Sequence, residues 1–311
     1  MIMQYPPQKN LNRHVKSLFI CLLLVLVACE AESPEHYLSE GKVLLKQGDL
    51  DSARVQFQNA LQLNPSLPEA YFQLALVAEK KEGWGGMLRN LLDTITIDPS
   101  HLQAQIKLGQ LYLLGAKYDK AAKQAQIILQ LNPGNITGQL MQGAVKLRQG
   151  KNEAAIQDIE QVLVKQPYFV NAVALKVAYL KAEERNAEAL QFLKQGIAHN
   201  PDDRDLRLLK IRMDMDSKAY GQAVNEYEAL IDKFPDDVSL LVPFAELLLF
   251  VGRQEEAEQY LRAAIDKQPE NLKLKLKLVE LTRKRDVKQA ESLLTEFIRI
   301  SPEQSVLKFQ L

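Results

Sequence analysis

Residues 34–67 read PEHYLSEGKVLLKQGDLDSARVQFQNALQLNPSL. Apolar residues in the first half follow the spacing of one helical stripe, and those in the second half follow another. Two small residues, Gly41 and Ala53, would allow the two helix backbones to approach closely. Pro65 has no backbone N–H, so it ends the second helix and begins a turn. The stretch therefore predicts two helices that pack against each other in antiparallel orientation.

The same pattern recurs along the chain at a fixed interval. Prolines follow one another every 34 residues, at Pro65, Pro99, Pro133, Pro167, Pro201, Pro235 and Pro269. Pro302 arrives one residue early. A fixed period of this length is the signature of an internal repeat, in which each unit buries its apolar face against its neighbours.

Residues inside the repeat agree with two close helices. When each of these prolines is numbered 32, position 20 is small in most copies, namely Ala53, Ala121, Ala155, Ala189, Ala223 and Ala257. Position 34 often carries a residue that can cap the next helix. These capping candidates are Asn135, Asp203, Asp237 and Asn271.

The pattern resembles the tetratricopeptide repeat family. The first repeat matches it at Tyr37, Gly41, Leu44, Ala53, Phe57, Ala60 and Pro65. The resemblance covers residues 34–302 in eight repeats and implies an all-α, right-handed superhelical solenoid of helix-turn-helix units. The second repeat departs from the pattern at residues 83–87, where glycines should loosen a helix start. The seventh has Pro243 inside its first helix, which predicts a kink or late start. The eighth has lost one residue between its helices.

Residues 1–28 are predicted to be a signal peptide. Three cations, Lys9, Arg13 and Lys16, precede an apolar run that is too short for a comfortable membrane span. The sequence Leu26-Val27-Ala28-Cys29 resembles the lipobox of bacterial lipoproteins, which implies acylation of Cys29 by fatty acids such as palmitate. Several acyl chains would anchor the protein stably to a membrane. The alternative is a plain secretory signal in which Cys29 is incidental.

The remaining short segments suggest a cellular location and a cap for the last repeat. Residues 29–33 would form a short tether. Glu30 follows the lipidated cysteine, whereas lipoproteins kept at the inner membrane often carry aspartate there. The resemblance therefore favours the periplasmic face of the outer membrane, with the inner membrane as the alternative. Residues 303–311 are predicted to be a C-terminal stub that caps the last repeat, and a docking tail is the alternative.

No constellation of residues predicts catalysis. His36, His101 and His199 do not stand at metal-ligand spacing, and we expect them on the surface or in turns. Residues 143–151 lack the spacing of a phosphate-binding loop. The chain has 39 basic and 39 acidic residues, which gives no electrostatic footprint for nucleic acid. We therefore expect a non-enzyme without cofactor, metal, small-molecule substrate or nucleic-acid partner.

The resemblance also implies that the first helices line a concave groove. Positions 2, 5, 9 and 12 of each first helix would face it, and we call these positions the inner face. The candidate contact residues on the inner face are Leu38, Lys42, Phe72, Ile106, Gln110, Leu140, Leu208, Arg212, Val242 and Glu246. Position 5 is an apolar row, which favours an amphipathic helix or apolar peptide of a protein partner. The alternative is that the row is buried between repeats.

These expectations together predict a membrane-anchored scaffold for protein–protein interaction in the bacterial envelope. Lipoproteins of similar architecture suggest exopolysaccharide assembly and export, including those encoded with protein-sorting systems. A first alternative is type IV pilus and secretin biogenesis. A second is an adaptor for an envelope hydrolase. A carboxylate clamp is not expected, because family members with that site carry Lys at position 5 and Asn at position 9.

Overall fold

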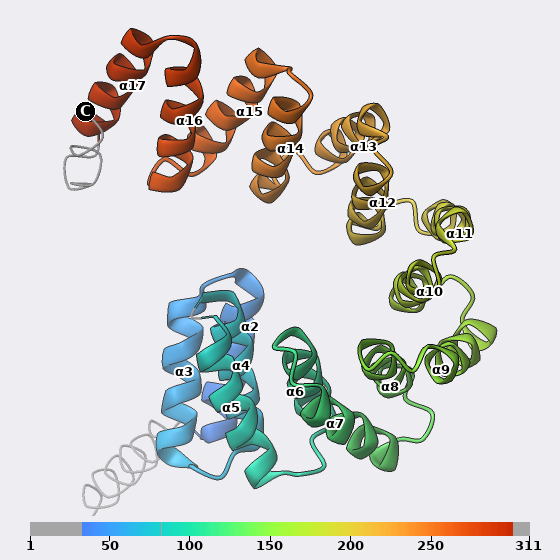
Figure 1. Ribbon diagram of the computed structural model, residues 1–311. Helices are drawn as coiled ribbons and strands as arrows, with labels where there is room; N and C mark the ends of the chain where they lie inside the picture. The colour runs from blue at the N-terminus through green and yellow to red at the C-terminus, as the bar shows by residue number, and fades with distance from the viewer. Residues whose placement is uncertain (1–32, 82, 301–311) are drawn as a thin grey trace, which may run out of the picture. The chain divides into compact units, whose positions relative to one another are not determined.

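A computed structural model describes residues 33–81 and 83–300, and these residues form sixteen α-helices and no strand (Figure 1). The predicted signal peptide, the predicted lipidation site Cys29 and the predicted C-terminal stub all lie outside the described residues. No helix in the described ranges has both the length and the apolar character that a membrane span requires. The all-α fold and the repeat of two helices are confirmed.

The first helices of the repeats begin 34 residues apart, at the period of the prolines. They are α2 (Pro34–Gln47), α4 (Pro68–Lys81), α6 (Leu102–Leu114), α8 (Ile136–Arg148), α10 (Val170–Ala182), α12 (Arg204–Asp216), α14 (Val238–Phe250) and α16 (Leu272–Arg285). The second helices are α3 (Leu50–Leu63), α5 (Trp84–Ile97), α7 (Tyr118–Leu131), α9 (Asn152–Lys165), α11 (Asn186–His199), α13 (Tyr220–Lys233), α15 (Gln254–Lys267) and α17 (Val287–Ile300). Only Asp286 separates α16 from α17, so the lost residue of the eighth repeat falls in its turn.

The chain divides into two compact units between Lys151 and Asn152. In the first unit, α2 to α8, the small residues act as the sequence predicts. Ala53 is fully buried, and a Cβ added to Gly41 would lie 2.5 Å from the Phe57 ring. The absence of a side chain at Gly41 therefore lets α2 and α3 approach closely.

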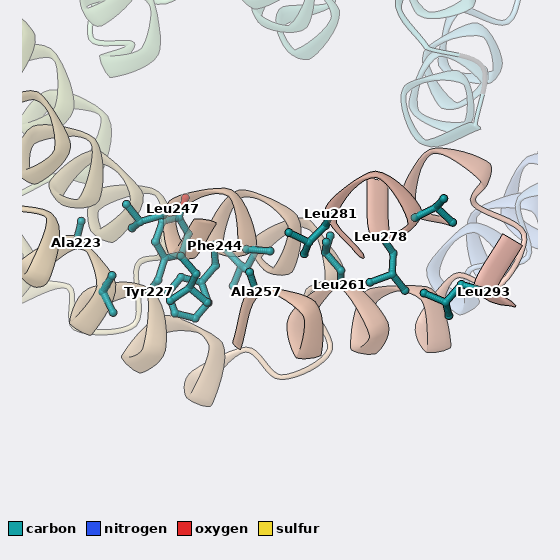
Figure 2. Packing of buried hydrophobic residues seen from close by; sticks show 14 of the residues in the cluster. Ala223, Tyr227, Phe244, Leu247, Ala257, Leu261, Leu278, Leu281 and Leu293 are labelled. Atoms are coloured by element: carbon teal, nitrogen blue, oxygen red, sulfur yellow. The ribbon is translucent and has the colours of Figure 1, made fainter. Parts of the chain in front are cut away.

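The second unit, α9 to α17, holds a continuous apolar core over its last three repeats (Figure 2). Ala223 and Ala257, both at position 20, are fully buried in it. The Phe244 ring lies 5.2 Å from that of Tyr227 and 4.7 Å from that of Tyr260, measured between centroids. Phe244 of α14 thus contacts aromatic rings of α13 and α15, the second helices of two successive repeats. Such contacts make the core continuous from one repeat to the next.

Helix caps confirm three of the four predicted residues. Asn135, Asp203 and Asp237 each accept a backbone N–H from the first turn of the following helix, at 2.8–3.0 Å. Asn271 is a correction, because its side chain makes no cap hydrogen bond and instead donates to Gln268 Oε1 at 2.9 Å. The α16 helix therefore begins without a side-chain cap.

Pro243 neither delays nor interrupts α14, which begins at Val238 and continues to Phe250. The hydrogen bond that proline cannot donate would have gone to the carbonyl of Ser239, an exposed residue in the first turn. Water can satisfy that carbonyl, so the helix persists. The glycines of the second repeat likewise do not delay α5, which begins at Trp84 directly after Gly83 in a left-handed conformation (φ 77°).

Candidate functional site

The apolar row at position 5 is half-buried in the structure. Leu38, Phe72 and Ile106 in the first unit each pack against a buried cluster while part of the side chain stays accessible. Leu208 and Val242 do the same in the second unit. The row therefore contributes both to the core and to the surface of the inner face. This result is intermediate between the two alternatives from the sequence, an open contact surface and a row buried between repeats.

Leu140 differs from the other members of the row. Its exposed fraction is 5 %, so it belongs to the core of the first unit rather than to an open surface. The expectation that Leu140 contacts a partner is therefore not supported by its position. Gln110 and Arg212, by contrast, are exposed at position 9 of their helices and offer polar groups to solvent.

A polar cluster on the inner face of the first unit surrounds Glu69. Lys42 Nζ lies 2.6 Å from Glu69 Oε1, and Gln73 Nε2 donates to the same oxygen at 2.9 Å. His101 Nε2 lies 3.2 Å from Glu69 Oε2. The cluster thus joins α2, α4 and the start of α6 through one carboxylate.

Burial alone would raise the pKa of Glu69, but hydrogen bonds from Lys42, Gln73 and His101 outweigh that effect. The pKa of Glu69 is consequently lowered below its ordinary value, and the group is a carboxylate at neutral pH. A carboxylate accepts hydrogen bonds and pairs with cations, which suits an orienting contact.

His101 was expected on the surface or in a turn, and its role is more specific. Its Nδ1 accepts the backbone N–H of Ala104 at 3.2 Å, so the ring caps α6. An accepting Nδ1 carries no proton, which leaves the proton on Nε2 for donation to Glu69. Position 34, where the caps of other repeats stand, is the sequence signal that could have identified this residue.

In the second unit the candidate Glu246 forms an ion pair with Lys277 of α16, one repeat further along. Lys277 also lines a hollow of about 520 Å³ on α16, whose other lining residues are Lys273, Leu276, Val279, Glu280 and Arg283. No motif predicts a role for these residues, and the alternating Lys and Leu of residues 272–278 are the sequence signal that could have identified some of them. In the described parts of the chain, no three His, Cys, Asp or Glu side chains gather as metal ligands.

Family models of the tetratricopeptide repeat match residues 41–81, 180–240 and 214–276. No curated protein sequence matches the chain. With the fold, the family matches support assignment of the repeats to the tetratricopeptide repeat family. This fold supports a scaffold for protein–protein interaction, and proteins of the family are generally non-catalytic.

Solved structures show the same fold at low sequence identity. A tetratricopeptide repeat protein from Parabacteroides merdae is 18 % identical with a TM-score of 0.59, over 81 % of this chain and 99 % of that one. Pseudomonas aeruginosa pilF is 19 % identical with a TM-score of 0.50, over 66 % and 93 %. Human IFIT1, a dimer with m7Gppp-AAAA, is 16 % identical with a TM-score of 0.61, over 89 % and 70 %. Such identities show the fold alone.

Proposed function

We propose that this protein is a lipid-anchored, non-catalytic scaffold of the bacterial envelope that holds a segment of a partner protein on its inner face. The observation that carries the proposal is the half-buried apolar row at position 5, which is accompanied by exposed polar side chains at Gln110 and Arg212. Apolar surface held in a fixed position by a repeat array is a common docking surface for helices and extended peptides.

The inner face supplies contacts of two kinds. Phe72 and Ile106 offer apolar surface that the core already holds in place, so a partner binds without ordering them. Charged groups around that surface orient the partner segment. The exposed Arg212 provides such a group in the second unit, whereas the charge of Glu69 in the first unit is already paired with Lys42. Orientation by charge contributes to specificity more than to affinity.

The membrane anchor in this proposal is Cys29. Its lipobox-like context supports acylation, and the first described helix begins only five residues later, at Pro34. A tether this short would hold the first repeat near the bilayer. The periplasmic face of the outer membrane and a role in exopolysaccharide assembly or export complete the proposal.

The test is mass spectrometry of proteins crosslinked to the full chain in native membranes, beside a Cys29→Ser variant. We expect export components in the wild-type sample and their loss when the anchor is removed. Recovery of secretin components instead would indicate pilus biogenesis. Recovery of a hydrolase with and without the anchor would replace the scaffold by an adaptor for that enzyme.

A further inference from the structure

The last repeat concentrates positive charge on its first helix and at the start of its second. Residues 272–288 contain seven basic and two acidic residues, although the whole chain is balanced. The basic residues are Lys273, Lys275, Lys277, Arg283, Lys284, Arg285 and Lys288, and the acidic ones are Glu280 and Asp286. A basic stretch within an otherwise balanced chain is a candidate binding surface for an anionic partner.

Several of these cations are already engaged. Lys277 forms an ion pair with Glu246. Arg285 Nη2 lies 3.0 Å from Glu258 Oε2, and Lys284 Nζ lies 3.6 Å from Glu280 Oε1. Lys275 is buried, and its Nζ lies 5.7 Å from the centre of the Phe297 ring. Lys275, Lys277 and Arg285 are therefore not available to a partner without breaking existing contacts. Lys284 is exposed, as is its partner Glu280, but it does not line the hollow on α16.

Lys273 and Arg283 are different. Both side chains are exposed, and neither has an ion-pair partner among the described residues. They stand at positions 2 and 12 of the repeat, on the inner face, and both line the hollow on α16. A separation of ten residues along an α-helix corresponds to about 15 Å. The half-buried Leu276 lies between them.

We propose that the inner face of α16 binds an acidic segment of the partner polypeptide. Two side-chain carboxylates of that segment pair with Lys273 and Arg283, and an apolar side chain between them contacts Leu276. An extended chain advances about 3.3 Å per residue, so the two acidic residues stand four to five positions apart. This inference rests on the proposed function, because it names the chemistry of the segment that the scaffold holds.

Glu280 further restricts the charge pattern that a bound segment can carry. Its carboxylate lies on the same face between Leu276 and Arg283, where it repels a third acidic group. The complementary segment therefore carries negative charge at its two ends and neutral or positive charge between them. Leu276 at position 5 and Glu280 at position 9 also distinguish this surface from a clamp for a C-terminal carboxylate.

The lining favours a peptide over a nucleic acid. The side chains around the hollow are aliphatic or charged, and none is an aromatic ring on which a base would stack. A uniformly charged phosphate backbone would also place a negative group against Glu280. A peptide avoids both problems because its charge and apolar contacts can be arranged residue by residue.

The test uses the full chain and a fluorescein-labelled peptide of about 14 residues. The peptide carries two Glu residues five positions apart with a Leu between them, and a matched peptide has Gln in place of both Glu residues. We expect the acidic peptide to bind more tightly, and its affinity to fall as salt rises. In the double variant Lys273→Glu and Arg283→Glu, the Kd should rise by about tenfold.

Lys288→Glu is the matched control, because Lys288 is an exposed cation of the same stretch outside the hollow. It should change the Kd by less than about twofold. If charge reversal disturbs folding, as judged by circular dichroism, Lys273→Gln with Arg283→Gln should weaken binding by a smaller factor. Equal affinity for the two peptides, or no effect of the double variant, would overturn the proposal.

Two further probes separate the alternatives. Tighter binding of a single-stranded oligonucleotide of equal charge would assign the surface to nucleic acid, and tighter binding of anionic vesicles would assign it to lipid. Either result overturns the proposal. Partner crosslinking to the inner face of the first unit does not involve α16, so its persistence would show that the scaffold function stands when the α16 proposal fails.

Discussion

The rings of Phe72 and His101 pack with their centroids 4.8 Å apart and their planes inclined by 42°. Phe72 stands at position 5 of the second repeat, and His101 caps the first helix of the third. The contact therefore links an inner-face residue to the start of the next repeat. It holds the exposed part of Phe72 in place while the rest of the side chain packs into the core.

Replacement of His101 tests whether its cap at the start of α6 stabilises the fold. His101→Ala removes an acceptor from the start of α6, and loss of a helix cap typically costs about 1 kcal/mol in the free energy of unfolding. His101→Asn keeps a capping acceptor and should recover most of that loss. Denaturation by urea measures both variants. Equal losses in the two would show that the cap contributes little.

The lowered pKa of Glu69 predicts how stability depends on pH. A group with a depressed pKa in the folded state contributes stability above its unfolded-state pKa, near 4.5, and loses it as pH falls through the folded-state pKa. Glu69→Gln should therefore be less stable than the wild type at pH 7. The difference should narrow as pH falls below the unfolded-state pKa, because the wild-type carboxyl becomes protonated as pH approaches its lower folded-state pKa. A difference that stays constant from pH 7 to pH 3 would contradict this assignment.

The Gly41→Ala variant tests whether α2 and α3 need a residue without a side chain where they approach closely. A Cβ at this position would lie 2.5 Å from the Phe57 ring, so Gly41→Ala should lower the free energy of unfolding by about 1–3 kcal/mol. Gly85→Ala is the matched control, because a Cβ there meets nothing within 4 Å. It should stabilise α5 by about 0.5 kcal/mol. Unfolding curves for both variants decide the matter, and a neutral Gly41→Ala would refute the packing argument.

Leu140 should behave as a core residue. Leu140→Ala removes a buried side chain and should cost about 2–4 kcal/mol in the free energy of unfolding. Leu114→Ala is the comparison, because Leu114 is 67 % exposed and its loss should change stability by less than about 0.5 kcal/mol. Thermal denaturation measures both. Similar costs for the two would indicate that the environment of Leu140 is not core-like.

The sequence predicts the helices well because their boundaries depend on local chemistry. Pro65 and its counterparts fix the period, and Ala53 or Ala223 can only be small where two backbones meet. The cap expected of Asn271 and the late start expected from Pro243 are both wrong, for local reasons that a pattern does not contain. The Asn271 side chain donates to Gln268 instead of capping α16. Pro243 removes a hydrogen bond whose acceptor would be the carbonyl of the exposed Ser239.

The candidate site was less predictable, because it depends on contacts between repeats. The sequence places Phe72 and Leu140 at equivalent positions, yet one is half-buried and the other buried. Nothing in the repeat pattern brings His101 to Glu69, which lies 32 residues earlier. The free cations Lys273 and Arg283 were hidden by the balanced charge of the whole chain. Their lack of partners appears only once the ion pairs of Lys277 and Arg285 are known.

Charge substitution at Phe72 or Ile106 would test partner capture poorly, because both side chains also pack against the core. Gln110 is a better probe. It lies on the inner face and is exposed, so a photo-crosslinking amino acid fits there without disturbing the packing. Val164 provides the control, since its side chain is 82 % exposed on the second helix of its repeat, away from the inner face.

The most direct test is photo-crosslinking from Gln110 and from Val164 in the full chain in native membranes, followed by mass spectrometry of the products. A scaffold that holds its partner on the inner face should give a discrete crosslinked polypeptide from Gln110 and none, or far less, from Val164. Equal crosslinking from both positions, or a product from Val164 alone, would contradict capture on the inner face.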